Sequence, residues 1–144
     1  MMAVQMHWSY DKFLPSDLEA GHAAIEELMT ALGAATWEGM DLFRIQMAIE
    51  EAVVNAIEHG NKKDPNKKIR LVFDVTPEKA VMEISDEGAG FDHRNVADPT
   101  TEDLVDKPRG RGVMLMRELM DEVIFNEVGN HVVMIKMRSP AVPE

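Results

Sequence analysis

A carboxylate and an amide stand one helical turn apart in residues 41–60, DLFRIQMAIEEAVVNAIEHG. Glu51 and Asn55 are spaced i,i+4, so their side chains share one helix surface. A carboxylate there can accept a proton from a hydroxyl group, and an amide oxygen is a hard ligand that suits Mg²⁺ paired with phosphate. Asparagine is a mediocre helix former, so its place in mid-helix favours a functional role. A solvated helix face is the alternative interpretation.

A second candidate site is the turn Asp86-Glu87-Gly88-Ala89-Gly90, which follows a predicted strand. Asp86 is an acceptor-only carboxylate at the end of a sheet, and it can accept a hydrogen bond from an exocyclic amine such as that of adenine. Gly88 and Gly90 allow a flat ring to approach the backbone. The alternative interpretation is an ordinary tight turn.

A third candidate is Arg109-Gly110-Arg111-Gly112, which precedes the apolar run VMLM. Glycines at a helix N-terminus expose unpaired N–H groups to an anion, and arginines add charged donors. A flexible hinge with solvated arginines is the alternative interpretation. The long polar loop 92–109 joins the second and third candidates, and we expect it to close over a nucleotide.

The composition limits the possible functions. The chain has 144 residues with a net charge of −11 and no cysteine, which excludes disulfides, thiolate nucleophiles and cysteine-ligated zinc. An acidic domain binds nucleic acid poorly. No apolar run approaches the ~20 residues that span a bilayer, and the N-terminus lacks the pattern of a signal peptide. We therefore expect a globular cytoplasmic protein that binds neither nucleic acid nor membranes.

The elements that must position these residues follow from hydrophobic periodicity and turn signals. A strand at 7–13 precedes a helix at 18–32, with Ser16 as its N-cap, Glu19 completing a capping box, and Gly33 as its end. Further elements are expected at 39–59 (helix), 69–76 and 80–86 (strands), 112–120 (helix), and 123–128 and 131–137 (strands joined by a two-residue Gly129-Asn130 turn). This order predicts an α+β fold, a two-layer sandwich in which three helices cover one face of a mostly antiparallel sheet, as a single domain over residues 1–144.

Taken together, EEAVVNAIEHGN, SDEGAGFD and GRGVMLMRELMDEV occur in an order that resembles the GHKL ATPases, whose Bergerat fold contains a mixed sheet. The sequences of these motifs are most similar to those of the small bacterial anti-sigma-factor serine kinases. The resemblance implies that Glu51 is the general base that activates a serine hydroxyl and that Asn55 binds Mg²⁺. Glu50 precedes Glu51, and only the spacing to Asn55 favours the second glutamate.

The resemblance also implies an ATP site. Asp86 would bind the adenine amino group beside Gly88 and Gly90, and Gly110 and Gly112 would end an ATP lid near the phosphates, with Arg111 between them. His59, Asn61 and Lys62 are further positions that lie near the nucleotide under this interpretation. Phosphoryl transfer in such a site depends mainly on positioning and charge stabilisation.

Three functions are compatible with this resemblance. The first is an ATP-dependent serine/threonine kinase that phosphorylates an anti-sigma antagonist, sequesters a sigma factor and forms a homodimer as its relatives do. The second is a non-catalytic, ATP-gated protein-binding switch. The third is a detached catalytic domain of a sensor histidine kinase; His22 lacks the pattern of a phosphoacceptor. The larger chaperone, gyrase and mismatch-repair members need longer chains, so we expect a free-standing kinase.

Overall fold

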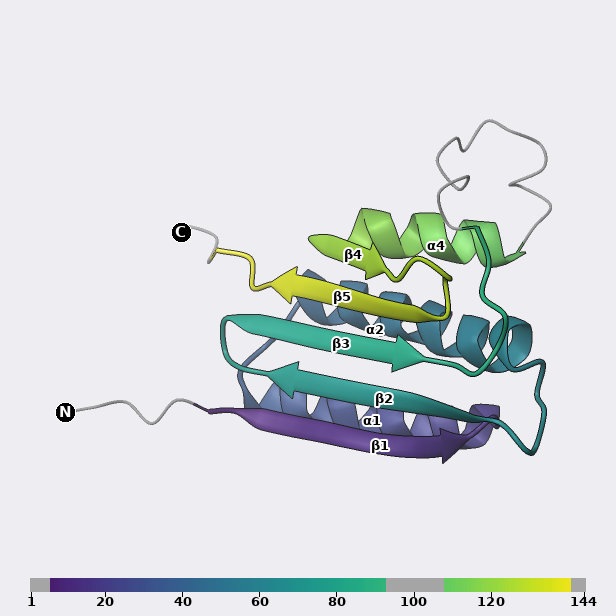
Figure 1. Cartoon of the computed structure of the whole chain (residues 1–144). Coiled ribbons are helices and arrows are strands. Elements are labelled where there is room, and N and C mark those ends of the chain that lie inside the picture. The colour runs from purple at the N-terminus through teal and green to yellow at the C-terminus, as the bar shows by residue number, and fades with distance from the viewer. Residues whose placement is uncertain (1–5, 93–107, 141–144) are drawn as a thin grey trace.

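A computed structural model describes residues 6–92 and 108–140, which form two layers (Figure 1). One layer is a sheet of five strands in the order β1-β2-β3-β5-β4, and each pair of neighbours is antiparallel. The strands are β1 (Trp8–Pro15), β2 (Lys68–Val75), β3 (Lys79–Ser85), β4 (Glu122–Phe125) and β5 (His131–Met137). The predicted α+β sandwich is confirmed.

The second layer consists of helices on one face of the sheet (Figure 1). They are α1 (Leu18–Ala34), α2 (Met40–Val54), which continues into a π-helix η1 (Asn55–Gly60), and α4 (Pro108–Leu119). α2 packs against both α1 and α4 and is therefore the central helix. No helix in residues 6–92 and 108–140 is long and apolar enough to cross a bilayer.

Strict alternation along the strands sets which face carries the core. In β2 the residues Ile69, Leu71, Phe73 and Val75 are fully buried beneath the helices, whereas the intervening residues face outward. The antiparallel register places Met82 and Met134 beside Phe73 on the same inner face. A period of two therefore fixes one buried and one open face, and it anchors α2 above the strand ends that carry the site.

The structure corrects the predicted start and end of α1. The N-cap is Asp17, whose carboxylate accepts from the backbone N–H of Glu19 at 2.7 Å. Ser16 is buried instead and donates to the carbonyl of Lys67 at 2.7 Å. This hydrogen bond links the end of β1 to the start of β2. The helix also passes through Gly33, and the left-handed residue that follows it is Thr36, with φ of 70°.

The predicted two-residue turn between the last two strands is wrong. β4 ends at Phe125 and β5 begins at His131, so five residues connect them. The side-chain oxygen of Asn126 accepts from the backbone N–H groups of Gly129, Asn130 and His131 at 2.8–3.2 Å. This asparagine organises a wider loop than Gly129-Asn130 alone would form.

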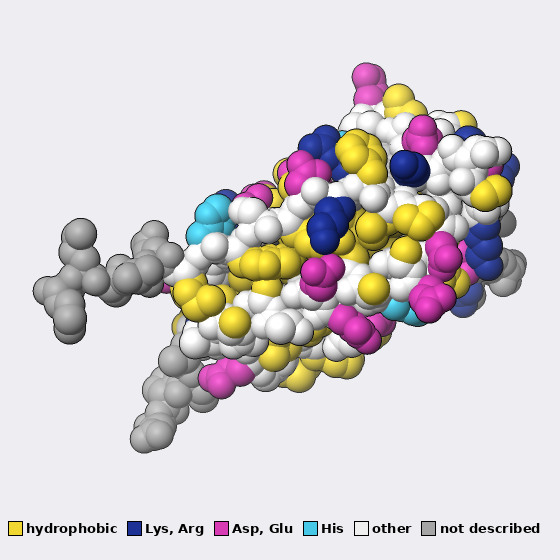
Figure 2. Space-filling view, turned by 90° about the horizontal axis from the view of Figure 1, so that it is seen from below, with side chains coloured by type: hydrophobic (Ala, Val, Ile, Leu, Met, Phe, Trp, Pro, Cys, Tyr) yellow, Lys and Arg dark blue, Asp and Glu magenta, His cyan; other side chains and the backbone are white. Residues whose placement is uncertain are grey.

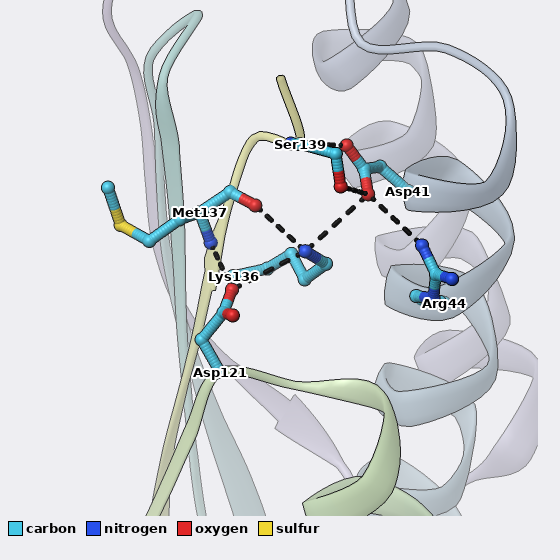
Figure 3. A network of polar contacts seen from close by, with 6 residues as sticks. All are labelled: Asp41, Arg44, Asp121, Lys136, Met137 and Ser139. Carbon is cyan, nitrogen blue, oxygen red and sulfur yellow. Dashed lines mark hydrogen bonds and ion pairs between the residues drawn. The ribbon is translucent and has the colours of Figure 1, made fainter. Parts of the chain in front are cut away.

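A buried ion pair fastens the end of the sheet opposite the glycine turns (Figure 3). Lys136 Nζ lies 3.5 Å from Asp41 Oδ1 and 3.4 Å from Asp121 Oδ2, and it donates to the carbonyl of Met137 at 2.8 Å. Ser139 donates to Asp41 from both its N–H and its hydroxyl group, at 2.8 and 2.7 Å. The network joins the C-terminal end of β5 to the first turn of α2.

The same contacts control the charge of Asp41. Burial by itself would raise the pKa of Asp41, but the hydrogen bonds from Ser139 and the nearby Lys136 ammonium outweigh it and leave the pKa below the ordinary value of 3.8. A carboxyl group with a lowered pKa stabilises the fold above its ordinary pKa, and this contribution is lost as the pH falls through the folded-state value.

We predict that Asp41→Ala lowers the free energy of unfolding by about 3–5 kcal/mol at pH 7, because Lys136 then lies buried without its buried partner. Urea denaturation measures this loss. The difference from the unaltered protein should shrink below pH 3.8. Asp11→Ala is the control: it breaks the exposed Asp11–Arg70 pair, and because water and salt screen a surface ion pair it should cost much less than Asp41→Ala. Equal losses in the two variants would contradict this account.

Candidate active site

Asn55 of the first candidate and Asp86 of the second line one pocket, at the end of the sheet where β3 stops. α2 and η1 contribute its helical side, the turn after β3 its floor, and α4 and the β4–β5 loop the remaining sides. The lining residues are Ala52, Asn55, Ala56, Ile84, Asp86, Phe91, Met116, Phe125, Gly129, Asn130, His131 and Val132. An apolar pocket with a few polar groups is the usual form of a small-molecule site.

Asn55 is the first residue of the π-helix and is 93% buried, with an exposed fraction of 7%. Its Nδ2 atom has no hydrogen-bond partner within the described residues, which is uncommon for a buried amide. The side chain lines the pocket. A polar group held unpaired at a pocket wall fits a role in ligand binding better than a role in the fold.

Glu51 and Gly112 meet at Asn55. A methyl group on Gly112 would lie 2.8 Å from Glu51 Oε2 and 3.0 Å from Asn55 Nδ2. Gly112 is buried in α4, so α4 and α2 approach there without a side chain between them. The i,i+4 spacing predicted that the two polar groups share one helix surface, and the structure places that surface against Gly112. Glu50 accepts instead from Gln46, at 3.3 Å, and lines a groove between α1 and α2.

Gly110 and Arg111 lie inside α4, because the helix begins at Pro108 and not after the glycines. Proline is favoured at the first position of a helix, and this early start was missed. Gly110 is buried and Arg111 is exposed. Both still belong to the first turn, whose N–H groups have no partner within the helix. The loop expected to form an ATP lid lies mostly outside the described residues.

Asp86 lies at the far side of the pocket in a turn made by close backbone contacts. Its carboxylate accepts from the N–H of Gly88 at 2.8 Å. Gly90 has a φ of 82°, a left-handed conformation that favours glycine, and its Cα lies against the carbonyl of Val128. Both glycines of the motif are therefore required by geometry, Gly90 by its backbone angle and Gly88 by the space around it.

The β4–β5 loop is a part of the pocket that the sequence did not predict. The N–H of Asp86 donates to the carbonyl of Asn130 at 2.9 Å, and Asn130 Nδ2 donates to the carbonyl of Gly88 at 3.2 Å. Phe91 and Phe125 pack edge to face beside them, with ring centroids 5.5 Å apart. The sequence feature that could have indicated this loop is Asn126, whose side chain accepts from the loop's backbone N–H groups. The loop reaches the pocket only because β5 pairs with β3.

Asn61 is one of the three further residues expected near the nucleotide, and its contacts give it a structural role. Asn61 is 1% exposed, and its side chain bonds to Ser16, to the carbonyl of Lys68 and to the N–H of Glu87. Lys62 is exposed and left-handed, with φ of 53°, and His59 is half-buried.

The described side chains alone would not complete the coordination of a metal ion at this site. Within the described residues there is no group of three or more His, Cys, Asp or Glu side chains that could hold a metal ion. One neutral amide oxygen from Asn55 suits Mg²⁺ that takes its remaining ligands from phosphate oxygens and water. The donor set therefore fits a magnesium–nucleotide complex, and it does not fit a metal held by protein side chains alone.

Comparison with known proteins decides the family. The histidine kinase-like ATPase domain matches residues 14–136, which includes all three motifs. The chain belongs to this family. The histidine kinase-like domain is of the GHKL type, so the resemblance predicted from the sequence is confirmed.

Similar proteins include the serine-protein kinase RsbW of Bacillus subtilis (strain 168), 33% identical over 99 residues, which are 64% of this chain and 62% of the relative. RsbW of Staphylococcus epidermidis is 33% identical over 104 residues, 67% of this chain and 65% of the relative. RsbW of Staphylococcus aureus (strain Newman) is 32% identical over the same shares of the two chains. The chain thus spans less than two thirds of the length of these relatives.

Two buried asparagines, Asn55 and Asn61, give a test of the site in this histidine kinase-like domain. We predict that Asn55→Leu leaves the free energy of unfolding unchanged or higher, since it removes the unpaired buried Nδ2 atom. It should abolish Mg²⁺-dependent ATP binding, since it also removes the amide oxygen. Asn61→Ala should lower the free energy of unfolding by about 1–3 kcal/mol, because it breaks bonds to buried partners. Thermal and urea denaturation measure both. A strongly destabilised Asn55→Leu would show that Asn55 belongs to the fold.

Proposed function

We propose that this domain binds ATP with Mg²⁺ and transfers the γ-phosphate to a serine or threonine of another protein. The observation that supports it is that Asn55 and Asp86 line one pocket, and that Glu51 and Gly112 meet at Asn55. An oxygen ligand for magnesium and an acceptor for a base amine therefore border one cavity, with a proton acceptor beside the first. That combination matches nucleotide-dependent phosphoryl transfer.

Each residue has a separate role in this proposal. The Asp86 carboxylate accepts from the adenine amine beside Gly88 and Gly90, and the Asn55 amide oxygen holds Mg²⁺. Bound Mg²⁺ would neutralise charge on the phosphate oxygens. Glu51 accepts the proton of the attacking hydroxyl group as the hydroxyl oxygen bonds to the γ-phosphorus and the bond from the γ-phosphorus to the leaving ADP breaks.

The first turn of α4 completes the proposed site on the phosphate side. Gly112 allows the helix to lie close to α2, and Gly110 belongs to the first turn, whose N–H groups favour an anion. Arg111 is exposed there and carries a positive charge in a chain with a net charge of −11. We assign Arg111 to the phosphates on these grounds.

We further propose that the protein acts as an anti-sigma factor, because the similar RsbW proteins are named serine-protein kinases and the motifs resemble those of anti-sigma kinases. Its partners would be an anti-sigma antagonist, a sigma factor and a second copy of the chain.

Hydrophobic side chains reach the surface in a band on the β1 side, among acidic and basic ones (Figure 2). On the open face of the sheet Phe13, Ile124 and Met137 are exposed. Such surfaces suit protein partners. We propose that the protein is located in the cytoplasm.

We predict that Glu51→Gln reduces the rate of phosphoserine formation by roughly 10²–10⁴-fold with little change in ATP affinity, because only the proton acceptor is lost. The assay follows transfer from γ-labelled ATP to a candidate antagonist protein encoded beside this one. Glu50→Gln is the matched control and should keep the full rate, since Glu50 faces the groove between α1 and α2.

The other two functions give different outcomes in the same assay. ATP binding without phosphoserine, and no effect of Glu51→Gln, would identify a non-catalytic switch. An acid-labile product would identify a sensor histidine kinase domain. A rate loss in Glu50→Gln equal to that in Glu51→Gln would contradict the assignment of the base.

A further inference from the structure

The end of the π-helix packs directly on the turn that carries Asp86. A methyl group on Gly60 would lie 2.6 Å from Asp86 Oδ1 and would overlap the other carboxylate atoms. Likewise, a methyl group on Gly88 would overlap the carbonyl of Gly60. Because real Cβ atoms do not approach so closely, the carboxylate of Asp86 rests against the bare Cα of Gly60. Gly60 thus determines where this carboxylate lies.

The neighbouring residue, Asn61, holds the same turn through a hydrogen bond. Its side-chain oxygen accepts from the backbone N–H of Glu87 at 2.7 Å. Its amide nitrogen donates to Ser16 Oγ at 2.8 Å and to the carbonyl of Lys68 at 2.9 Å. One buried side chain therefore links the turn after β3 to the end of β1 and the start of β2, and this bracing fixes the backbone beside Asp86.

The π-helix η1 joins Asn55, its first residue, to Gly60 and Asn61 at its end. The N–H of Asn61 donates to the carbonyl of Ala56 at 2.8 Å, an i,i+5 bond that is characteristic of a π turn. Asn55 and Gly60 are also five residues apart, so this wider turn brings them to the same side. An α-helical turn would align residues four apart instead. The π-helix thereby has Asn55 as its first residue and Gly60, which contacts the Asp86 carboxylate, as its last.

We propose that Gly60 and Asn61 are positioning residues that set the base selectivity of the site by holding the Asp86 carboxylate. The proposal rests on the proposed ATP-binding function. Adenine presents an amine donor where guanine presents an oxygen acceptor, and an ionised carboxylate can only accept. A fixed carboxylate therefore binds adenine and rejects guanine, whereas a displaced one discriminates less.

The test compares the dissociation constants of Mg·ATP and Mg·GTP by titration calorimetry. In Gly60→Ala the methyl group displaces the carboxylate, so ATP should bind roughly 10-fold or more weakly, whereas GTP binding should change little and selectivity should fall. Gly33→Ala is the matched control: it is a helical glycine with no atom within 4 Å of the added methyl group, and it should keep both affinities.

A second pair of variants keeps the test decisive where Gly60→Ala folds poorly. Asn61→Ala and Ser16→Ala remove hydrogen bonds from the same buried network, so both should lower the melting temperature. Only Asn61→Ala releases the N–H of Glu87, and only this variant should reduce the preference for ATP over GTP. Asn61→Asp keeps the acceptor for that N–H and should retain more of the preference than Asn61→Ala.

The outcomes separate this inference from the function on which it rests. Unchanged ATP selectivity in folded Gly60→Ala or Asn61→Ala would overturn the positioning role, as would equal loss of selectivity in Ser16→Ala. Equal binding of ATP and GTP by the unaltered protein would overturn the inference and leave ATP binding intact. Failure of the unaltered protein to bind either nucleotide would instead contradict the proposed function itself.

Discussion

Close backbone contact at glycines is the constraint on which this site depends. Gly112 lies against Glu51 and Asn55, and Gly60 lies against Asp86. A side chain at either position would separate the segments that border the pocket. The polar groups of the site are thus brought together by the absence of Cβ atoms between elements distant in the chain.

The rest of the fold keeps these contacts in register. The buried inner faces of β2 and β3 hold α2 above the sheet, and the Asp41–Lys136 pair anchors the opposite end of that helix to β5. The pocket lies where α2 changes to a π-helix. An unpaired buried amide at Asn55 is therefore compatible with a stable domain.

The sequence predicted what depends on local pattern. Alternation of apolar residues predicted the strands, and the spacing of Glu51 and Asn55 correctly predicted that they share a surface. The errors concern residues whose role depends on distant partners. Ser16 is drawn away from the N-cap by Lys67, and the β4–β5 loop enters the pocket because β5 pairs with β3. The π-helix was also missed, because the periodicity of apolar residues does not distinguish it from the α-helix that it continues.

Paramagnetic broadening in NMR spectra tests the central claim most directly, with Mn²⁺ in place of Mg²⁺. In the presence of ATP, the account predicts strong broadening of the amide signals of Glu51, Asn55 and Gly112, and none at Lys136, at the opposite end of the sheet. Broadening spread over exposed acidic residues, or the same pattern without ATP, would contradict a shared magnesium–nucleotide site.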